Sequence, residues 1–158
     1  MNPKQFTLRK EYFGGLIYDS KTANVMLLTP AEYEQAKNFT YPGYTEANTR
    51  PVPPPKNIHA NVLTAPIRVF DSFTRRCNYQ CPHCYFTSGA FVSEKRRTTE
   101  QTKAVIKKFY DAGTMEWRFT GGEALIMPGI FEAIGYAKSL GMNVGLYSNG
   151  WWADSITK

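Results

Sequence analysis

Three cysteines stand close together in the segment RRCNYQCPHCYF, residues 75–86, and the 158-residue chain has no others. Cys77, Cys81 and Cys84 are separated by three and then two residues, so one short loop carries all three thiols. Disulfides need pairs of cysteines, and a closed structural zinc site needs four ligands. A set of three thiols therefore indicates a different kind of metal centre, or one completed by another residue.

Two kinds of metal centre remain open on this pattern. Zinc could be held with His83 or His59 as the fourth ligand, although zinc sites usually separate their C-x2-C pairs by a longer span. His83 stands between Cys81 and Cys84, where its ring can hardly close the same tetrahedron. An iron–sulfur cluster held by three thiolates would leave one iron without a protein ligand. We favour the cluster and keep zinc as the alternative.

The elements around this loop follow an alternating pattern. It comprises a β-rich run (65–73), a helix (99–112), a strand (115–120), a helix (128–140) and a third strand (143–150), and the segment WWADSITK then begins a third helix. The order β-α-β-α-β predicts an α/β fold with parallel strands joined by crossover helices. Sites in such sheets lie beyond the carboxyl ends of the strands.

Three motifs follow the ends of the three predicted strands: the cysteine loop, GGE at 121–123 and SNG at 148–150. We therefore expect them to meet at one edge of the sheet. Gly121 and Gly122 allow the backbone to approach a ligand closely and to adopt a positive φ. Glu123 offers a carboxylate for a charge-assisted hydrogen bond to an ammonium group.

A C-x3-C-x2-C loop after the first strand and GGE after the second resemble the radical S-adenosylmethionine (SAM) superfamily, over residues 65–158. The resemblance implies that Cys77, Cys81 and Cys84 hold a [4Fe–4S] cluster whose open iron binds the amino and carboxylate groups of SAM. It further implies that one-electron reduction cleaves SAM to methionine and a 5′-deoxyadenosyl radical, which abstracts hydrogen from a substrate. An external electron donor would supply that electron.

The resemblance also assigns the remaining residues of the SAM site. His83 takes the aromatic position before the third cysteine, which lies near the adenine in this family. Gly121, Gly122 and Glu123 would receive the SAM ammonium group. Ser148 or Asn149 would contact the methionyl carboxylate or the substrate.

The N-terminal segment predicts a hairpin, with strands at Leu16–Tyr18 and Val25–Leu28, followed by a short helix ending near Lys37. Thr29 and Glu32 form a capping box at the start of that helix. Residues 8–34 resemble the leader-recognition module of radical SAM peptide maturases, which adds the leader peptide to its sheet as a strand. This implies a ribosomal peptide or a protein as substrate; a hairpin that only packs on the barrel is the alternative.

The chain divides into an N-terminal hairpin segment (1–40), a proline-rich linker (41–64) and a truncated radical SAM core (65–158). The family's partial (β/α)6 barrel has six units, of which this core supplies the first half. We therefore expect the chain to be the N-terminal portion of an enzyme and to be inactive alone. Two rivals remain: a metal-stabilised binding module without catalysis, and a radical SAM enzyme acting on a small metabolite.

Composition excludes several other classes of protein. Hydrophobic residues make up 42% of the chain and aromatic residues 15%, which is typical of a globular protein. The net charge of +6 comes from scattered basic residues, so no continuous stripe predicts nucleic-acid binding. Neither a secretory signal nor a membrane-spanning run is present, and clustered thiols suit a reducing compartment. We expect a cytoplasmic protein with no membrane partner.

Overall fold

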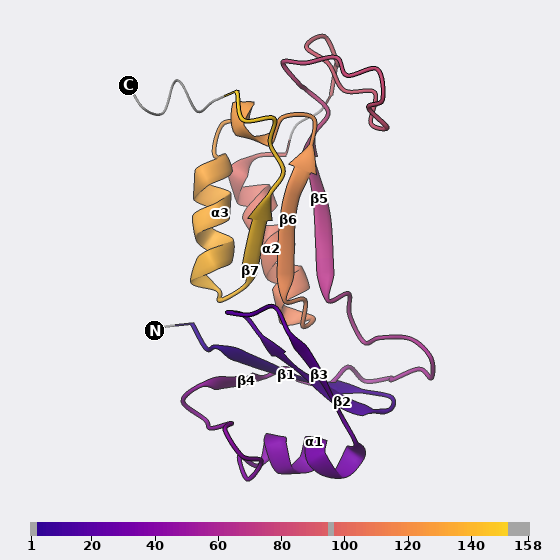
Figure 1. Ribbon diagram of the computed structural model, residues 1–158, viewed down its shortest axis with the longest axis vertical. Coiled ribbons are helices and arrows are strands. Elements are labelled where there is room, and N and C mark those ends of the chain that lie inside the picture. Colours follow the sequence, from indigo (N-terminus) through magenta and orange to yellow (C-terminus); the bar gives the residue numbers. More distant parts are fainter. Residues whose placement is uncertain (1–2, 95–96, 152–158) are drawn as a thin grey trace.

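The computed structural model describes residues 3–94 and 97–151, which form two β-sheets with three α-helices (Figure 1). The elements in chain order are β1 (Phe6–Glu11), β2 (Gly14–Asp19), β3 (Val25–Leu28), α1 (Pro30–Lys37), β4 (Thr49–Pro51), β5 (Arg68–Thr74), α2 (Thr99–Asp111), β6 (Glu116–Gly121), the 3₁₀ helix η1 (Ala124–Ile126), α3 (Ile130–Ser139) and β7 (Asn143–Leu146). Within the described residues, none of the helices has the length and apolar character needed to cross a membrane.

The N-terminal sheet has the strand order β3-β2-β1-β4. The predicted hairpin is confirmed by the antiparallel pairing of β2 with β3, and the predicted capping box is present at Thr29 and Glu32. The prediction missed two further strands of this sheet: β1, which pairs with β2, and β4, which pairs in parallel with β1. The sequence of β1 shows no alternating hydrophobic pattern, because two of its buried residues, Arg9 and Glu11, are charged.

Part of the predicted linker 41–64 contributes to this sheet. Strand β4, Thr49–Pro51, runs parallel to β1, and Val52 continues the pairing by donating from its amide to the Leu8 carbonyl at 2.8 Å. A proline is tolerated here because β4 is an edge strand, where a missing amide donor leaves no ladder bond unmade.

The second sheet is parallel, in the order β5-β6-β7, which confirms the predicted β-α-β-α-β pattern. Helices α2 and α3 pack on one face, where Trp117 and Phe119 of β6 meet Ile106 of α2 and Ala133 of α3. Strand β7 is shorter than the predicted 143–150, and the residues after Leu146 form a loop. The third helix predicted at WWADSITK, residues 151–158, lies outside the described residues apart from Trp151.

The N-terminal sheet packs against the end of the parallel sheet where the strands begin. Leu16 and Tyr18 of β2 form a buried cluster with Met115, which directly precedes β6. The Asn143 side-chain amide donates to the Ser20 carbonyl oxygen at 3.2 Å. The cysteine loop follows β5 at the opposite end (Figure 1). The N-terminal sheet therefore lies across the end of the parallel sheet where its strands begin, and the cysteine loop lies at the opposite end (Figure 1).

Candidate active site

The cysteine loop is closed at its base by backbone hydrogen bonds. The Cys77 amide donates to the Gly89 carbonyl, and the Gly89 amide donates to the Arg75 carbonyl, each at 3.2 Å. Further in, the Cys84 amide donates to the Cys81 carbonyl at 3.0 Å, which makes a turn between the second and third cysteines. The loop therefore has a defined stem that directly continues strand β5.

The three thiols are free and reach the surface to different extents. Cys81 is exposed, Cys77 and Cys84 are half-buried, and none forms a disulfide. Backbone hydrogen bonding to Ser88, with smaller contributions from Phe86 and Thr87, lowers the pKa of the Cys84 thiol. Because the thiolate is the metal-binding form of cysteine, the local backbone favours ligation at this position.

A cavity of about 530 Å³ lies beside the loop and is lined by Cys81, Cys84, Ser88 and Phe91, among others. Its volume is within the range of small-molecule sites. Within the described part of the chain, no three Cys, His, Asp or Glu side chains are grouped closely enough to hold one metal ion. A [4Fe–4S] cluster makes a different demand, because each thiolate binds its own iron. The set of three thiols fits such a cluster, and two of them, Cys81 and Cys84, line the cavity.

The glycines of GGE are required by the chain itself. A methyl group on Gly121 would stand 2.2 Å from the Thr74 carbonyl oxygen, and one on Gly122 would stand 2.0 Å from that of Arg76. The Gly122 amide donates to Thr74 at 2.6 Å, and the Glu123 amide donates to Arg76 at 2.8 Å. The absence of side chains at these two glycines thus lets GGE approach the stem of the cysteine loop and hold it in place.

Glu123 joins the second and third motifs. Its buried carboxylate accepts from the Leu125 amide at 2.8 Å through one oxygen and from the Asn149 amide at 2.7 Å through the other. The Asn149 side-chain amide donates to the Asn78 side-chain oxygen at 2.9 Å and lies 3.9 Å from the Cys77 sulfur. These contacts confirm that the cysteine loop, GGE and SNG meet at one edge of the sheet.

Ser148 and His83 lie less centrally. The Ser148 hydroxyl accepts from the Gly150 amide at 3.0 Å, within its own turn. His83 is exposed, and it is not among the residues that line the cavity. Their assigned contacts with SAM stay predictions, as do those of Gly121, Gly122, Glu123 and Asn149.

Two residues that sequence reasoning missed hold the site together. Asn78 lies between the first two cysteines and bridges to Asn149. Glu94 accepts from the Thr74 hydroxyl and, at 2.8 Å, from the Arg75 amide, so it ties the far end of the loop to the end of β5. Asn78 could have been identified from the sequence, because it is a polar residue between two predicted metal ligands. Nothing in the sequence pattern distinguishes Glu94.

Replacing Gly122 by alanine should destabilise this edge. The added methyl group meets backbone atoms that cannot move independently, and overpacking of this kind costs about 1–3 kcal/mol. Gly135 of α3 is the matched control, because a methyl group there meets nothing within 4 Å and should stabilise the helix by about 0.5–1 kcal/mol. Chemical denaturation of both variants measures the difference. Equal stability of the two would contradict the close approach described above.

Comparison with protein families matches residues 72–157 of this chain to the radical SAM superfamily. The curated relatives include Fe-coproporphyrin III synthase of Methanosarcina barkeri, 34% identical over 83 residues, and the sporulation killing factor maturation protein SkfB of Bacillus subtilis, 37% identical over 90 residues. PqqA peptide cyclase of Streptomyces rochei is 30% identical over 86 residues. These alignments cover 52%, 56% and 54% of this chain but only 21%, 22% and 24% of the relatives.

Solved structures of similar fold include SuiB of Streptococcus suis bound to its precursor peptide SuiA, with a TM-score of 0.73 at 13% identity. The likeness covers 96% of this chain and 43% of that one. SuiB bound to S-adenosylmethionine gives a TM-score of 0.70 over 95% of this chain and 42% of that one, again at 13% identity. The fold likeness therefore includes the N-terminal sheet, whereas the sequence matches above cover little more than half of the chain.

Proposed function

Because this chain belongs to the radical SAM superfamily, we propose that it is the N-terminal portion of an enzyme that cleaves SAM reductively in order to modify a ribosomal peptide or protein. The chain spans about a fifth to a quarter of the length of the curated relatives compared above. The activity of the whole enzyme is therefore part of this proposal.

Cys77, Cys81 and Cys84 are the residues that would hold the [4Fe–4S] cluster. When bound, the cluster supplies the electron that cleaves SAM to methionine and a 5′-deoxyadenosyl radical. The protein contributes the positions of the ligands, since GGE and Glu94 fix the two ends of the loop. Glu123 keeps Asn149 beside Cys77. This closeness to the first cysteine supports the proposal that the two residues receive the amino and carboxylate groups of SAM.

A peptide substrate is supported by the free edge of the N-terminal sheet. Strand β3 pairs only with β2 in the described sheet, and Val25 and Leu27 on it are 39% and 66% exposed. A cavity of about 220 Å³ beside it is lined by residues that include Met26 and Tyr44. An unpaired strand next to a side-chain pocket is the arrangement that accepts an extended peptide as a further strand.

The observation that carries the proposal is the extent of the fold likeness. A structure with its precursor peptide bound resembles this chain over the N-terminal sheet as well as the parallel sheet. One relative named above is a porphyrin enzyme, Fe-coproporphyrin III synthase, so a small-metabolite substrate is the second candidate. In that case the N-terminal sheet would serve only for packing.

Anaerobic reconstitution of the chain with iron and sulfide tests the cluster. We expect about four irons and four sulfides per chain and an absorption spectrum that changes when SAM is added. One tightly held zinc in place of the cluster, with no response to SAM, would overturn the proposal in favour of a metal-stabilised binding module. Metal analysis of the purified protein before reconstitution is the necessary control.

A further inference from the structure

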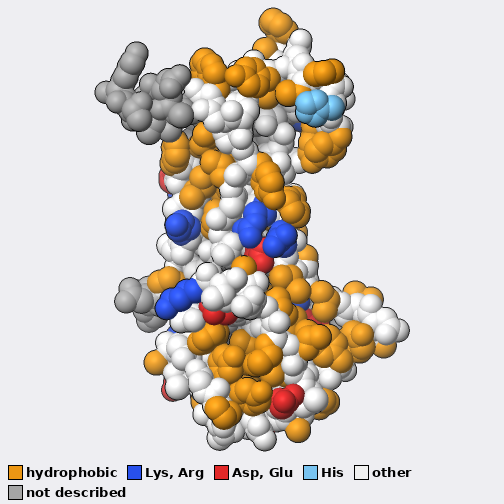
Figure 2. All heavy atoms as spheres, in the orientation of Figure 1, with side chains coloured by type: hydrophobic (Ala, Val, Ile, Leu, Met, Phe, Trp, Pro, Cys, Tyr) orange, Lys and Arg blue, Asp and Glu red, His pale blue; other side chains and the backbone are white. Residues whose placement is uncertain are grey.

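One face of the parallel sheet is left open by the described elements. Along β5, Arg68, Phe70 and Ser72 alternate with inward residues and are exposed, while α2 and α3 cover the opposite face. In the view of Figure 1, the strands lie in front of α2, so this open face is seen directly. Figure 2 shows basic side chains gathered around an acidic one near the middle of the same view.

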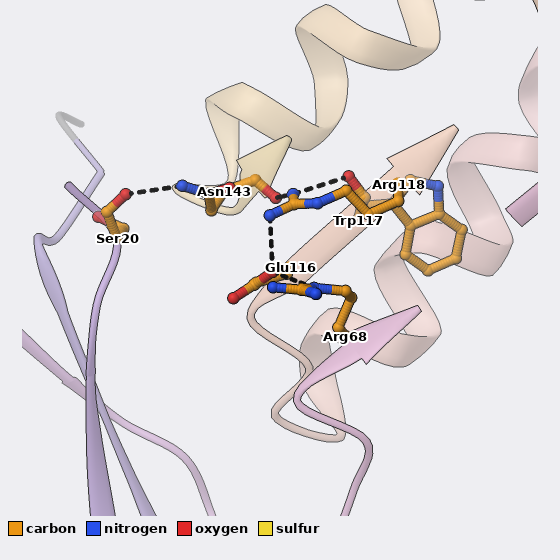
Figure 3. A network of polar contacts seen from close by, with 6 residues as sticks. All are labelled: Ser20, Arg68, Glu116, Trp117, Arg118 and Asn143. Atoms are coloured by element: carbon orange, nitrogen blue, oxygen red, sulfur yellow. Dashed lines mark hydrogen bonds and ion pairs between the residues drawn. The ribbon is translucent and has the colours of Figure 1, made fainter. Parts of the chain in front are cut away.

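Two arginines on this face share a single carboxylate oxygen. Arg68 Nε donates to Glu116 Oε2 at 2.5 Å, and Arg118 Nη2 donates to the same oxygen at 2.6 Å (Figure 3). Arg118 Nη1 also donates to the Asn143 carbonyl at 3.0 Å. Gly145 leaves room for this arginine, because a methyl group there would stand 2.6 Å from Arg118 Cδ. Arg118 is therefore held firmly across the sheet.

Arg68 retains unused donors. Its hydrogen bond to Glu116 uses Nε, and within the described residues its two terminal nitrogens make no hydrogen bond. The Arg68 side chain is 47% exposed, whereas those of Arg118 and Glu116 are 13% and 3% exposed. Among the described residues, the two guanidinium groups share this one carboxylate, which leaves one positive charge uncompensated, and that charge is accessible at Arg68.

Apolar surface continues from Arg68 toward the cysteine edge. The Phe70 ring lies 5.9 Å from the Arg68 guanidinium and 6.0 Å from the Tyr147 ring, and both rings are more than half exposed. A group with a carboxylate and a neighbouring apolar side chain would match this arrangement, since a guanidinium binds carboxylates through paired donors.

The position of Arg68 relates this surface to the path of a substrate. Arg68 begins β5, next to the N-terminal sheet, and the cysteine loop follows Thr74 at the other end. Six residue steps along a strand span about 20 Å. A peptide held by the N-terminal sheet would cross this face to reach the cysteine edge, and about six extended residues would separate the two points.

We propose that Arg68 binds an acidic side chain of the peptide substrate, with Phe70 and Tyr147 packing against the adjoining residue. That the ligand is a peptide rests on the proposed function. The anion site itself rests on the uncompensated positive charge and the unused donors of Arg68. The bound carboxylate would sit about six residues from the residue that reacts and would set the register of the substrate.

Binding of two short probes tests this assignment. Acetyl-Leu-Glu-Leu-amide and acetyl-Leu-Gln-Leu-amide differ only in the charge of the central residue. NMR titration of the ¹⁵N-labelled chain, followed at the arginine Nε–H signals, should give about threefold to tenfold tighter binding of the Glu peptide at low salt. Equal affinity for the two peptides would overturn the proposal.

Variants identify the residue responsible. Arg68→Gln should abolish the preference for the Glu peptide, and Arg68→Lys should retain part of it. Lys108→Gln, which removes one charge from the exposed surface of α2, should leave the preference unchanged. A preference that survives in Arg68→Gln, with the fold verified by circular dichroism, would overturn the assignment to Arg68.

A third probe distinguishes a side-chain carboxylate from the carboxylate at the C-terminus of a peptide. Acetyl-Leu-Gln-Leu with a free carboxyl end should bind more weakly than the Glu peptide; equal or tighter binding would overturn the choice of a side chain. These titrations need neither cluster nor SAM. Failed reconstitution would therefore overturn the proposed function alone, and a missing Glu preference would overturn only the anion site.

Discussion

Cys81→Ala is expected to weaken iron binding by the reconstituted chain at least about tenfold, because losing even a residue that only supports a metal ligand typically costs this factor in affinity. The three cysteines are the entire thiol supply of the chain, so no other thiolate can replace the missing one. Cys81 is also the most accessible of the three and lines the cavity beside the loop. Iron and sulfide analysis together with absorption spectroscopy measures the loss.

His83→Ala is the matched control in the same loop. His83 is exposed and stands between two of the cysteines, so its removal should leave the iron content unchanged if three thiolates hold a cluster. If His83 instead completes a four-ligand site, its removal should release the metal as Cys81→Ala does. Full cluster content in Cys81→Ala would contradict the ligand assignment outright.

The meeting of the three motifs at one edge of the sheet was predictable from sequence because each motif is local and each follows a strand. The cysteine spacing and GGE each lie within a few residues, and the alternation of strands and helices fixes the edge at which they meet. The contacts of Asn78 with Asn149 and of Glu94 with Thr74 join positions 71 and 20 residues apart. Contacts between residues so far apart in the sequence depend on the folded geometry, so no local sequence pattern predicts them.

The N-terminal sheet was harder to predict for a physical reason. A hydrophobic pattern marks a buried strand only when apolar residues fill the buried positions. In β1, Arg9 and Glu11 are each 1% exposed, so the strand reads as polar. Charged residues are buried there because Arg9 and Glu11 pair with each other. Each also has a polar partner outside the N-terminal sheet, the Gly113 carbonyl for Arg9 and the Thr64 amide for Glu11.

The buried pair joins the two sheets through the end of α2. Arg9 Nε donates to Glu11 Oε1 at 2.6 Å, and Arg9 Nη1 donates to the Gly113 carbonyl, just past the helix, at 2.8 Å. Arg50 of β4 donates to the Tyr110 carbonyl at 3.2 Å. Cations at a helix C-terminus satisfy its free carbonyls and oppose its negative dipole end. Burial lowers the pKa of Arg9, and the neighbouring Glu11 opposes that shift.

Glu11→Ala is expected to lower the free energy of unfolding by about 3–5 kcal/mol, because it leaves the Arg9 charge buried without its partner. The substitution also removes the acceptor for Thr64, whose amide donates to Glu11 Oε2 at 2.9 Å in the segment leading to β5. Chemical denaturation measures the loss. Glu34→Ala is the control, since its ion pair with Lys37 is 54% exposed on both sides and should contribute less than about 1 kcal/mol.

A double variant separates the charge effect from simple loss of contacts. Arg9→Met combined with Glu11→Leu removes both charges and refills the space with apolar side chains, so it should be more stable than Glu11→Ala alone. If the double variant is instead the less stable of the two, the hydrogen bond from Arg9 to the end of α2 outweighs the cost of burying its charge. If Glu11→Ala is as mild as Glu34→Ala, the pair does not join the two sheets, and the joint must depend on the apolar contacts of Tyr18 with Met115.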